Sequence, residues 1–220
     1  MSSSREEILA SVRGALADVR SEPDGSTSIR ADGPASAPAP ESEPLLHSME
    51  DVVALFAERV ADFRATVVRA DVAADAVADA VCEYDVGSLV VPSDLDTAWL
   101  AHVDPAVVRT DGDPLLSAVQ LDQLDAVLTG AVVGIADTGT VVLEHVGPGQ
   151  GRRVISLVPD IHVCVVLADQ VVASVPDAMS RLDPSRPQTW ISGPSATSDI
   201  ELNRVEGVHG PRTLHVIVIG

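Results

Sequence analysis

Lysine is absent from this 220-residue chain, so all 14 of its basic residues are arginine. A Schiff base, or a pyridoxal phosphate anchored by the protein itself, needs a lysine amine, and so does a P-loop of ordinary design. The absence excludes these kinds of chemistry. GC-rich coding accounts for a preference for arginine over lysine, and a salt-adapted acidic surface is the alternative explanation.

Aromatic residues and cysteines are also few, at 2% of the chain and two residues respectively. The core must therefore be aliphatic, which the 46% content of hydrophobic residues permits. Cys82 and Cys164 are isolated and lie in apolar stretches, so we expect two buried thiols in a reducing compartment rather than a disulfide or a metal site.

Long apolar runs and an apolar leader are missing as well. No stretch of about 18 apolar residues occurs, so we expect no transmembrane helix. The first residues lack the basic start and apolar core of a signal peptide, which predicts a cytoplasmic protein.

The net charge of −19 bears on partners. Contacts with nucleic-acid phosphates need clustered cations, so we do not expect a nucleic acid as the main partner. The chain has no H-x-x-x-H or H-E-x-x-H spacing, and we expect no metal site. It also lacks a G-x-G-x-x-G turn and a G-x-S-x-G elbow, which argues against a Rossmann dinucleotide site and a serine hydrolase.

Three segments differ in composition. Residues 1–20 carry apolar side chains at helical spacing and predict a tethered amphipathic helix. Residues 21–46 are rich in Pro, Ser and Ala, which predicts a flexible linker because such a composition buries too little surface to offset its ordering entropy. The helix could dock on the domain, on a second copy or on a partner protein, or stay loosely attached. Residues 47–220 form the predicted main domain.

Helical and strand patterns alternate from residue 47 onward. Near-continuous Val/Ile/Leu runs are typical of strands covered on both faces. We therefore expect an α/β fold, with a mixed, largely parallel sheet and helices on both faces, in which the 135–144 region could be antiparallel. Helices are predicted at 49–63, 71–84 and 175–182, and strands at 66–68, 86–91, 127–128, 132–136, 141–145, 154–158, 161–167, 190–192 and 214–219.

Two glycine-containing turns are candidate ligand sites. Thr138-Gly139-Thr140 follows a strand, and its hydroxyls and exposed N–H groups could bind a carboxylate or a phosphate, although a plain β-turn explains it too. The second turn, residues 147–153, combines three glycines with Arg152 and Arg153, which could bind an anion or belong to a solvated loop.

The most distinctive stretch lies near the end of the chain. Small polar turns bracket a short helical pattern, in which the spacing of Ser198 and Glu201 is that of a helix N-cap and thus of an anion site. His209 is the best-placed histidine for proton transfer, and capping plus a structural histidine is the simpler alternative. The predicted ligand-binding residues here are Ser192, Gly193, Ser195, Ser198, Asp199, Gly210 and Arg212.

These residues also carry a family resemblance. The Trp190–Arg212 segment, together with Thr129-Gly130, the 136–140 turn, residues 149–152 and residues 159–162, resembles the lactate utilization protein C family, whose members carry a LUD domain. The resemblance covers the C-terminal half by motif and the remainder by length and element order. It implies a fold of the sugar-phosphate isomerase/CoA-transferase (NagB/RpiA-like) kind.

The resemblance also implies a role in oxidising L-lactate to pyruvate beside two iron–sulfur partner proteins. With two cysteines, the chain lacks the thiolate clusters that such centres need, so the clusters are expected on the partners and no cofactor on this chain.

The alternative is an independent enzyme or binding protein for a CoA ester, a sugar phosphate or a hydroxy acid. A CoA transferase of this fold class would use a glutamate nucleophile, for which Glu144 and Glu201 are candidates.

Overall fold

The structure, a computed structural model, describes residues 19–21, 27–29, 48–112, 114–197, 205–206 and 209–220. The chain divides into two units, residues 1–44 and 45–220. In the first unit, β1 (Val19–Ser21) pairs antiparallel with β2 (Thr27–Ile29). The predicted helix before β1 lies outside the described residues.

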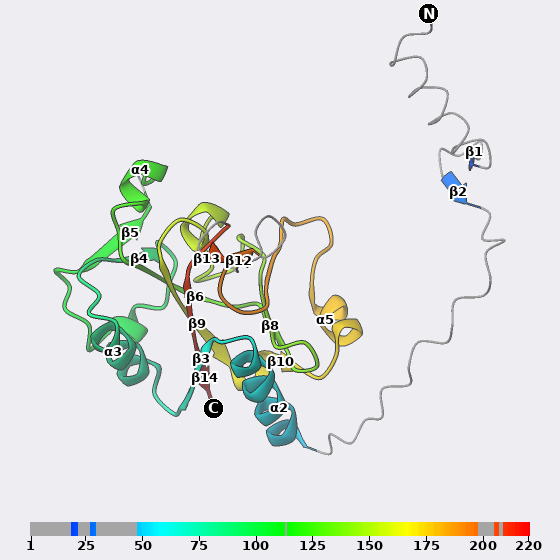
Figure 1. Ribbon diagram of the computed structural model, residues 1–220, viewed down its shortest axis with the longest axis horizontal. Coiled ribbons are helices and arrows are strands. Elements are labelled where there is room, and N and C mark those ends of the chain that lie inside the picture. Colours follow the sequence, from blue (N-terminus) through cyan, green and yellow to red (C-terminus); the bar gives the residue numbers. More distant parts are fainter. Residues whose placement is uncertain (1–18, 22–26, 30–47, 113, 198–204, 207–208) are drawn as a thin grey trace, which may run out of the picture. The chain divides into compact units, whose positions relative to one another are not determined.

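A six-stranded parallel sheet forms the centre of the second unit (Figure 1). Its strand order is β3-β14-β9-β6-β4-β5. The two seven-residue strands, β9 and β14, lie side by side and are almost entirely buried, as expected for Val/Ile-rich strands covered on both faces. The strands are β3 (Thr66–Ala70), β4 (Leu89–Pro92), β5 (Val108–Asp111), β6 (Ala126–Gly130), β9 (Ile161–Leu167) and β14 (Thr213–Ile219).

A second, four-stranded sheet has the order β10-β7-β8-β11. The antiparallel arrangement predicted for 135–144 is present here as the β7–β8 hairpin. The predicted α/β fold is therefore confirmed, but its parallel and mixed parts are two sheets rather than one. The strands are β7 (Val133–Ile135), β8 (Thr140–Leu143), β10 (Val171–Val172) and β11 (Thr189–Ile191), and a separate ladder pairs β12 (Ala196–Thr197) with β13 (Val205–Glu206).

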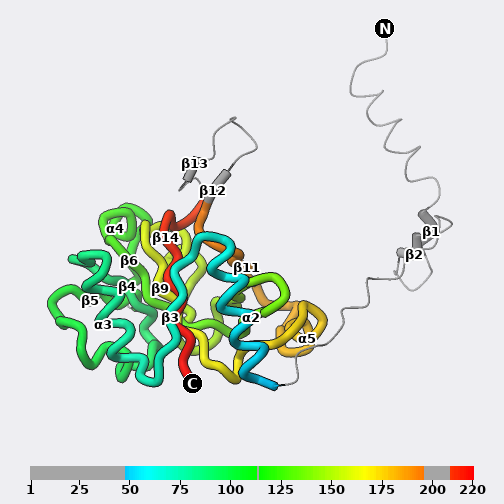
Figure 2. The backbone as a smooth tube through the Cα atoms, turned by 60° about the horizontal axis from the view of Figure 1, so that its bottom comes forward, coloured from blue at the N-terminus to red at the C-terminus, as the bar shows by residue number. Residues whose placement is uncertain are grey.

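Helices α2 (Met49–Asp62) and α3 (Ala73–Glu83) lie on opposite sides of the parallel sheet (Figures 1 and 2). The Ser48 hydroxyl caps α2 by accepting the Asp51 N–H, and Phe56 fills the core between α2 and the sheet. Burial of a phenylalanine at such a site contributes about 3–5 kcal/mol relative to alanine. The other helical segments are α4 (Ala118–Leu121), α5 (Val175–Arg181), and the 3₁₀ turns η1 (Thr97–Leu100), η2 (Arg153–Ser156) and η3 (Ala168–Gln170).

Two predictions are wrong. Residues 154–158 are not a strand, because the chain forms η2 there and packs Ile155 against Val90 and Val127 of the sheet. Cys82 is exposed rather than buried, because α3 turns Ala76 and Ala80, and not Cys82, towards the core. Cys164 is buried in β9, as expected.

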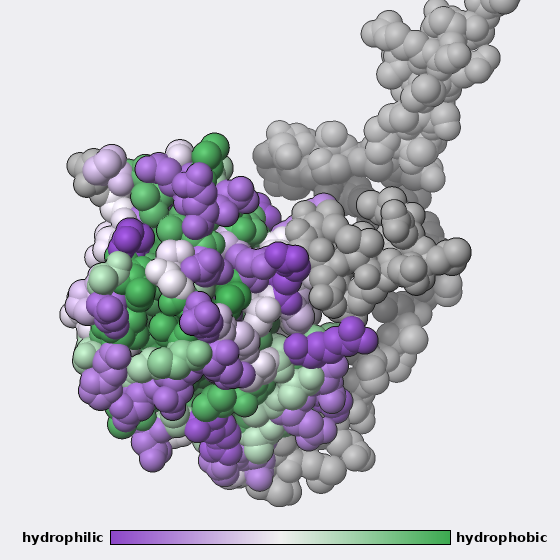
Figure 3. All heavy atoms as spheres, turned by 60° about the vertical axis from the view of Figure 1, so that its left-hand side comes forward, coloured by the Kyte–Doolittle hydropathy of each residue, from purple (hydrophilic) through white to green (hydrophobic). Residues whose placement is uncertain are grey.

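The surface around α3 and β5 mixes hydrophilic side chains with smaller areas of apolar ones (Figure 3). Within the described ranges, no helix is long and apolar enough to cross a membrane. Helix α2 has 14 residues, against the roughly 20 that a spanning helix needs.

Candidate functional site

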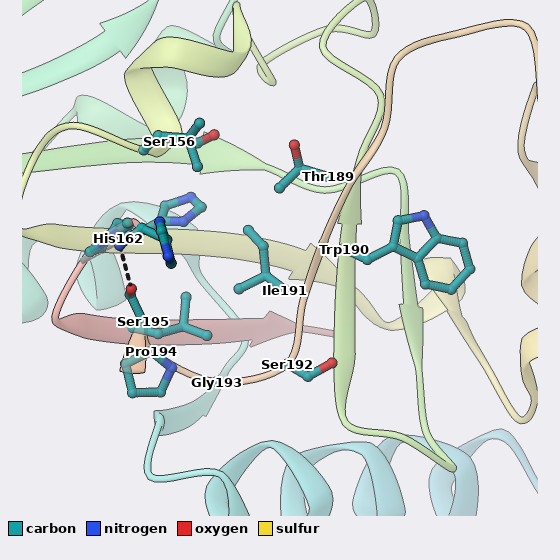
Figure 4. A pocket seen from close by; sticks show the side chains of 14 residues that line it. Ser156, His162, Thr189, Trp190, Ile191, Ser192, Gly193, Pro194 and Ser195 are labelled. Carbon is teal, nitrogen blue, oxygen red and sulfur yellow. Dashed lines mark hydrogen bonds between the residues drawn. The ribbon is translucent and has the colours of Figure 1, made fainter. Parts of the chain in front are cut away.

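A cavity of about 300 Å³ lies where β11 approaches the first residues of β9 and β14 (Figure 4). We call it the β11 cavity. Its floor and walls combine apolar groups with hydroxyls and imidazoles. The polar side chains that line it are those of Ser156, His162, Thr189, Ser192, Ser195 and His209.

Five of the predicted site residues meet at this cavity. Ser192, Gly193 and Ser195 follow β11, and His209 and Gly210 precede β14. The two segments are joined by hydrogen bonds: the Ser195 N–H donates to the Pro211 carbonyl at 2.8 Å, and the His209 N–H donates to the Ser195 hydroxyl at 3.1 Å (dashed in Figure 4). The predicted turns therefore do converge in space.

Gly193 sets the path of the first of these segments. Its φ of +87° lies in the left-handed region, and an added Cβ would lie 2.7 Å from both the Cβ and the carbonyl oxygen of Phe63. Only glycine combines this backbone angle with so close an approach to the end of α2. The close approach holds Ser192 and Ser195 at the cavity.

The Thr138–Thr140 turn supports the cavity without lining it. The Thr140 hydroxyl lies 2.7 Å from the hydroxyls of both Thr138 and Ser192. Gly139 has a φ of +56°, and an added Cβ there would lie 2.6 Å from the carbonyl carbon of Arg59 in α2. The turn thus packs against α2 and positions Ser192, instead of meeting a ligand in the β11 cavity.

The remaining candidates lie elsewhere. Glu144 is buried, and its two carboxylate oxygens accept the Asp183 N–H at 2.7 Å and Arg186 at 3.2 Å, so it anchors the loop before β11. Arg212 forms an exposed bidentate ion pair with Asp160. Ser198, Asp199 and Glu201 lie outside the described residues.

Three further residues line or support the cavity, although the sequence did not single them out. His162 is fully buried, and its Nε2 lies 2.8 Å from the Thr129 hydroxyl. Burial, together with a smaller effect of the nearby His145, lowers the pKa of His162 to about 4. His162 is therefore a neutral imidazole at neutral pH.

His145 and Thr189 are the other two. The Nδ1 of His145 lies 3.2 Å from the Gly151 carbonyl oxygen, and its Nε2 lies 2.7 Å from the Thr189 hydroxyl. Burial lowers the pKa of His145, the bond to Gly151 opposes that effect, and the charge of Arg153 adds to the lowering. No local pattern links positions 145 and 189, so only the fold could reveal the pair.

His145 also has an unusual backbone. Its φ of +61° is in the left-handed region, which is uncommon for a residue other than glycine. The neighbouring Glu144 N–H donates to the Gln150 side chain at 2.5 Å, and Gln150 itself is buried. These contacts hold the His145 conformation in place, and such strained positions cluster at functional sites.

A second cavity, of about 570 Å³, lies at the carboxyl ends of β4 and β5 beside the 147–151 loop. We call it the loop cavity. The carboxyl ends of the strands are also where open α/β sheets bind their ligands. Gly149 fastens the loop, with its N–H donating to Asp94 at 3.2 Å and its carbonyl accepting the Gly130 N–H at 2.7 Å.

The predicted anion site in this loop is partly occupied by the protein itself. Arg152 donates to both carboxylate oxygens of Asp111, at 2.6 and 2.8 Å. Burial acts to raise the pKa of Asp111, but the hydrogen bonds from Arg152 and the Leu116 N–H outweigh it, and the pKa is lowered. Arg152 therefore neutralises a buried carboxylate. In the part of the chain that the structure describes, no three His, Cys, Asp or Glu side chains gather as metal ligands.

Comparison with known proteins identifies the family. The LUD domain matches residues 53–219, which includes both sheets and both cavities. The chain belongs to the LUD domain family. Among its relatives, a protein of Deinococcus radiodurans named lactate utilization protein C is 42% identical over 219 residues, covering 97% of this chain and 94% of the relative.

Other members of the LUD domain family agree with this match. A lactate utilization protein C of Halalkalibacterium halodurans is 34% identical over 119 residues, half of each chain. A crystal structure of a DUF162 family protein from Deinococcus radiodurans superposes with a TM-score of 0.65 at 37% identity, covering 79% of this chain and 99% of the other. The family resemblance and the α/β fold inferred from the sequence are thereby confirmed.

Proposed function

We propose that this chain is the non-redox component of a system that oxidises L-lactate to pyruvate together with two iron–sulfur proteins. The observation that carries the proposal is the match to a lactate utilization protein C over 97% of the chain. Two cysteines cannot supply the four thiolates of a typical cluster, so in this proposal the electrons pass through the partners.

The lining of the β11 cavity suits a small polar substrate. The Ser195 oxygen accepts the His209 N–H, which leaves the serine hydroxyl hydrogen free to donate to a carboxylate. Exposed His209 stands beside it as the group that exchanges protons with solvent. We therefore assign the substrate to this cavity, with the Ser195 hydroxyl as the hydrogen-bond donor to its carboxylate.

Reconstitution tests the proposal. The two iron–sulfur proteins would be assayed for L-lactate-dependent reduction of an artificial acceptor, with and without this chain. Activity that requires the chain, and falls with Ser195→Ala and His209→Ala but not with the surface variant Glu50→Gln, is the expected result. Equal activity without the chain would contradict the proposal.

The loop cavity favours a second candidate, an independent enzyme or binding protein for a CoA ester or sugar phosphate. The observation that favours it is the position of the cavity at the carboxyl ends of β4 and β5, where such folds bind ligands. A melting temperature unchanged across a panel of phosphates and CoA esters would contradict this candidate, and a shift abolished by changes in the 147–151 loop would support it.

A further inference from the structure

The hydrogen bonds of His145 fix its tautomer. A carbonyl oxygen can only accept, so the 3.2 Å contact with Gly151 requires the hydrogen on Nδ1. A neutral imidazole then has no hydrogen on Nε2, and Nε2 must accept the hydroxyl hydrogen of Thr189 across their 2.7 Å contact. The line of donors therefore runs from Thr189 through His145 to Gly151.

This order determines what Thr189 offers to a ligand. Its single hydroxyl hydrogen is committed to His145, so its oxygen presents only lone pairs to the cavity. Thr189 and Ile191 face the cavity from β11, while Trp190 between them points to the other face of the strand (Figure 4). The two-residue period of the strand thus turns the Thr189 oxygen towards the substrate, where it can only accept a hydrogen bond.

We propose that Thr189, oriented by His145, makes the β11 cavity selective for a hydroxy acid over the corresponding keto acid. The identity of the acids, L-lactate against pyruvate, rests on the proposed function. The hydroxyl of L-lactate donates to Thr189, whereas the carbonyl of pyruvate can only accept and faces the threonine lone pairs. A polar group left unpaired on burial costs enough to weaken binding roughly tenfold.

The groups around His145 are consistent with its neutral state. The charge of Arg153 in η2 disfavours a positive charge on His145, and the buried His162 of β9 is itself neutral. On the side of the loop cavity stand Asp94 and the Asp111–Arg152 pair. The charge of Arg152 offsets that of Asp111, while Glu144, next in sequence, is directed to Arg186 and Asp183.

Calorimetric titration of the full chain with sodium L-lactate and with sodium pyruvate tests the selectivity. We expect wild type to bind L-lactate about tenfold or more tightly than pyruvate. Thr189→Val keeps the β-branched shape but removes the oxygen, so it should weaken L-lactate about tenfold and leave pyruvate unchanged. Thr189→Ser should restore the wild-type ratio. Equal affinities in wild type, or an unchanged ratio in Thr189→Val, would overturn the proposal.

The two proposals fail in distinguishable ways. If the reconstituted system requires the chain but wild type binds neither acid, the selectivity and the assignment of the substrate to the β11 cavity are refuted, and the role of the chain in lactate oxidation stands. If the expected ratios appear but oxidation proceeds equally without the chain, the proposed function is refuted and the selectivity stands.

Nitrogen NMR of the imidazole tests the premise separately. We expect a His145 signal of the Nδ1–H tautomer at neutral pH, assigned by its loss in His145→Asn, a residue that tolerates the left-handed backbone. An Nε2–H tautomer or an imidazolium would overturn the proposal.

Discussion

Acid should destabilise the fold through His162. The imidazole is neutral in the folded protein because burial lowers its pKa from 6.5 to about 4. Between these two pH values the unfolded chain binds a proton that the folded chain does not, so stability falls as the pH falls. Above about pH 6.5 the stabilisation is complete, and below about pH 4 both states are protonated and no more is lost.

The size of the effect follows from the same two values. Each unit of pKa difference corresponds to about 1.4 kcal/mol, so His162 alone should withdraw about 3 kcal/mol of unfolding free energy across this range. Because a small domain is stable by only about 5–15 kcal/mol, the loss is a large share of the total. His145 and His215, whose pKa values are also lowered by burial, act in the same direction.

Urea unfolding followed by circular dichroism at a series of pH values measures the loss. His162→Gln, which removes the titrating group and keeps a polar side chain near Thr129, is the matched control. The difference between wild type and this variant should shrink by about 3 kcal/mol between about pH 7 and about pH 4. A difference independent of pH would contradict this prediction, because His162 would then titrate alike in the folded and unfolded states.

Three further predictions concern packing, a buried charge and thiol reactivity. Gly193→Ala should lower the free energy of unfolding by more than about 1 kcal/mol, whereas Gly210→Ala, where an added Cβ meets nothing closer than 3.7 Å, should be nearly neutral in the same thermal melt. Arg152→Ala should lower the free energy of unfolding by about 3–5 kcal/mol, because it leaves the Asp111 carboxylate, whose side chain is 1% exposed, without its ion-pair partner. Arg69→Ala, at an exposed ion pair, should leave the melting temperature almost unchanged. Equal losses of stability in the two variants would contradict this ranking. A thiol reagent should modify the exposed Cys82 in the native protein but should react with Cys164 only after unfolding, because burial raises the pKa of the Cys164 thiol to about 12. Labelling of Cys164 in a native Cys82→Ser variant would contradict its burial.

The regular elements were predictable where burial leaves a period in the sequence. Strand β9 was predicted at its observed bounds, since seven apolar or buried residues between turn signals leave little choice. Residues 154–158 misled because a short apolar run does not distinguish a strand from a buried turn. The division into two sheets was not predictable, because strand partners are chosen by packing across the fold.

The cavity was predictable in part for a similar reason. Gly193 and the polar residues around it predict a turn that could meet a ligand, and in the structure this turn lines the β11 cavity. Thr189 and His145 carry no such signal: their chemistry exists only because β11 brings the hydroxyl within 2.7 Å of the imidazole, 44 residues away in the sequence.

Two-dimensional ¹H–¹⁵N NMR can locate L-lactate on the protein and thus test its assignment to the β11 cavity, because the two cavities are lined largely by different segments. We expect the amide signals of residues 189–193, 195, 209 and 210 to move on titration, and to move less in Thr189→Val. Shifts confined to residues 93–94, 111–112, 115, 146–147 and 151–152 would place the acid in the loop cavity and contradict the assignment to the β11 cavity, as would a spectrum that L-lactate leaves unchanged.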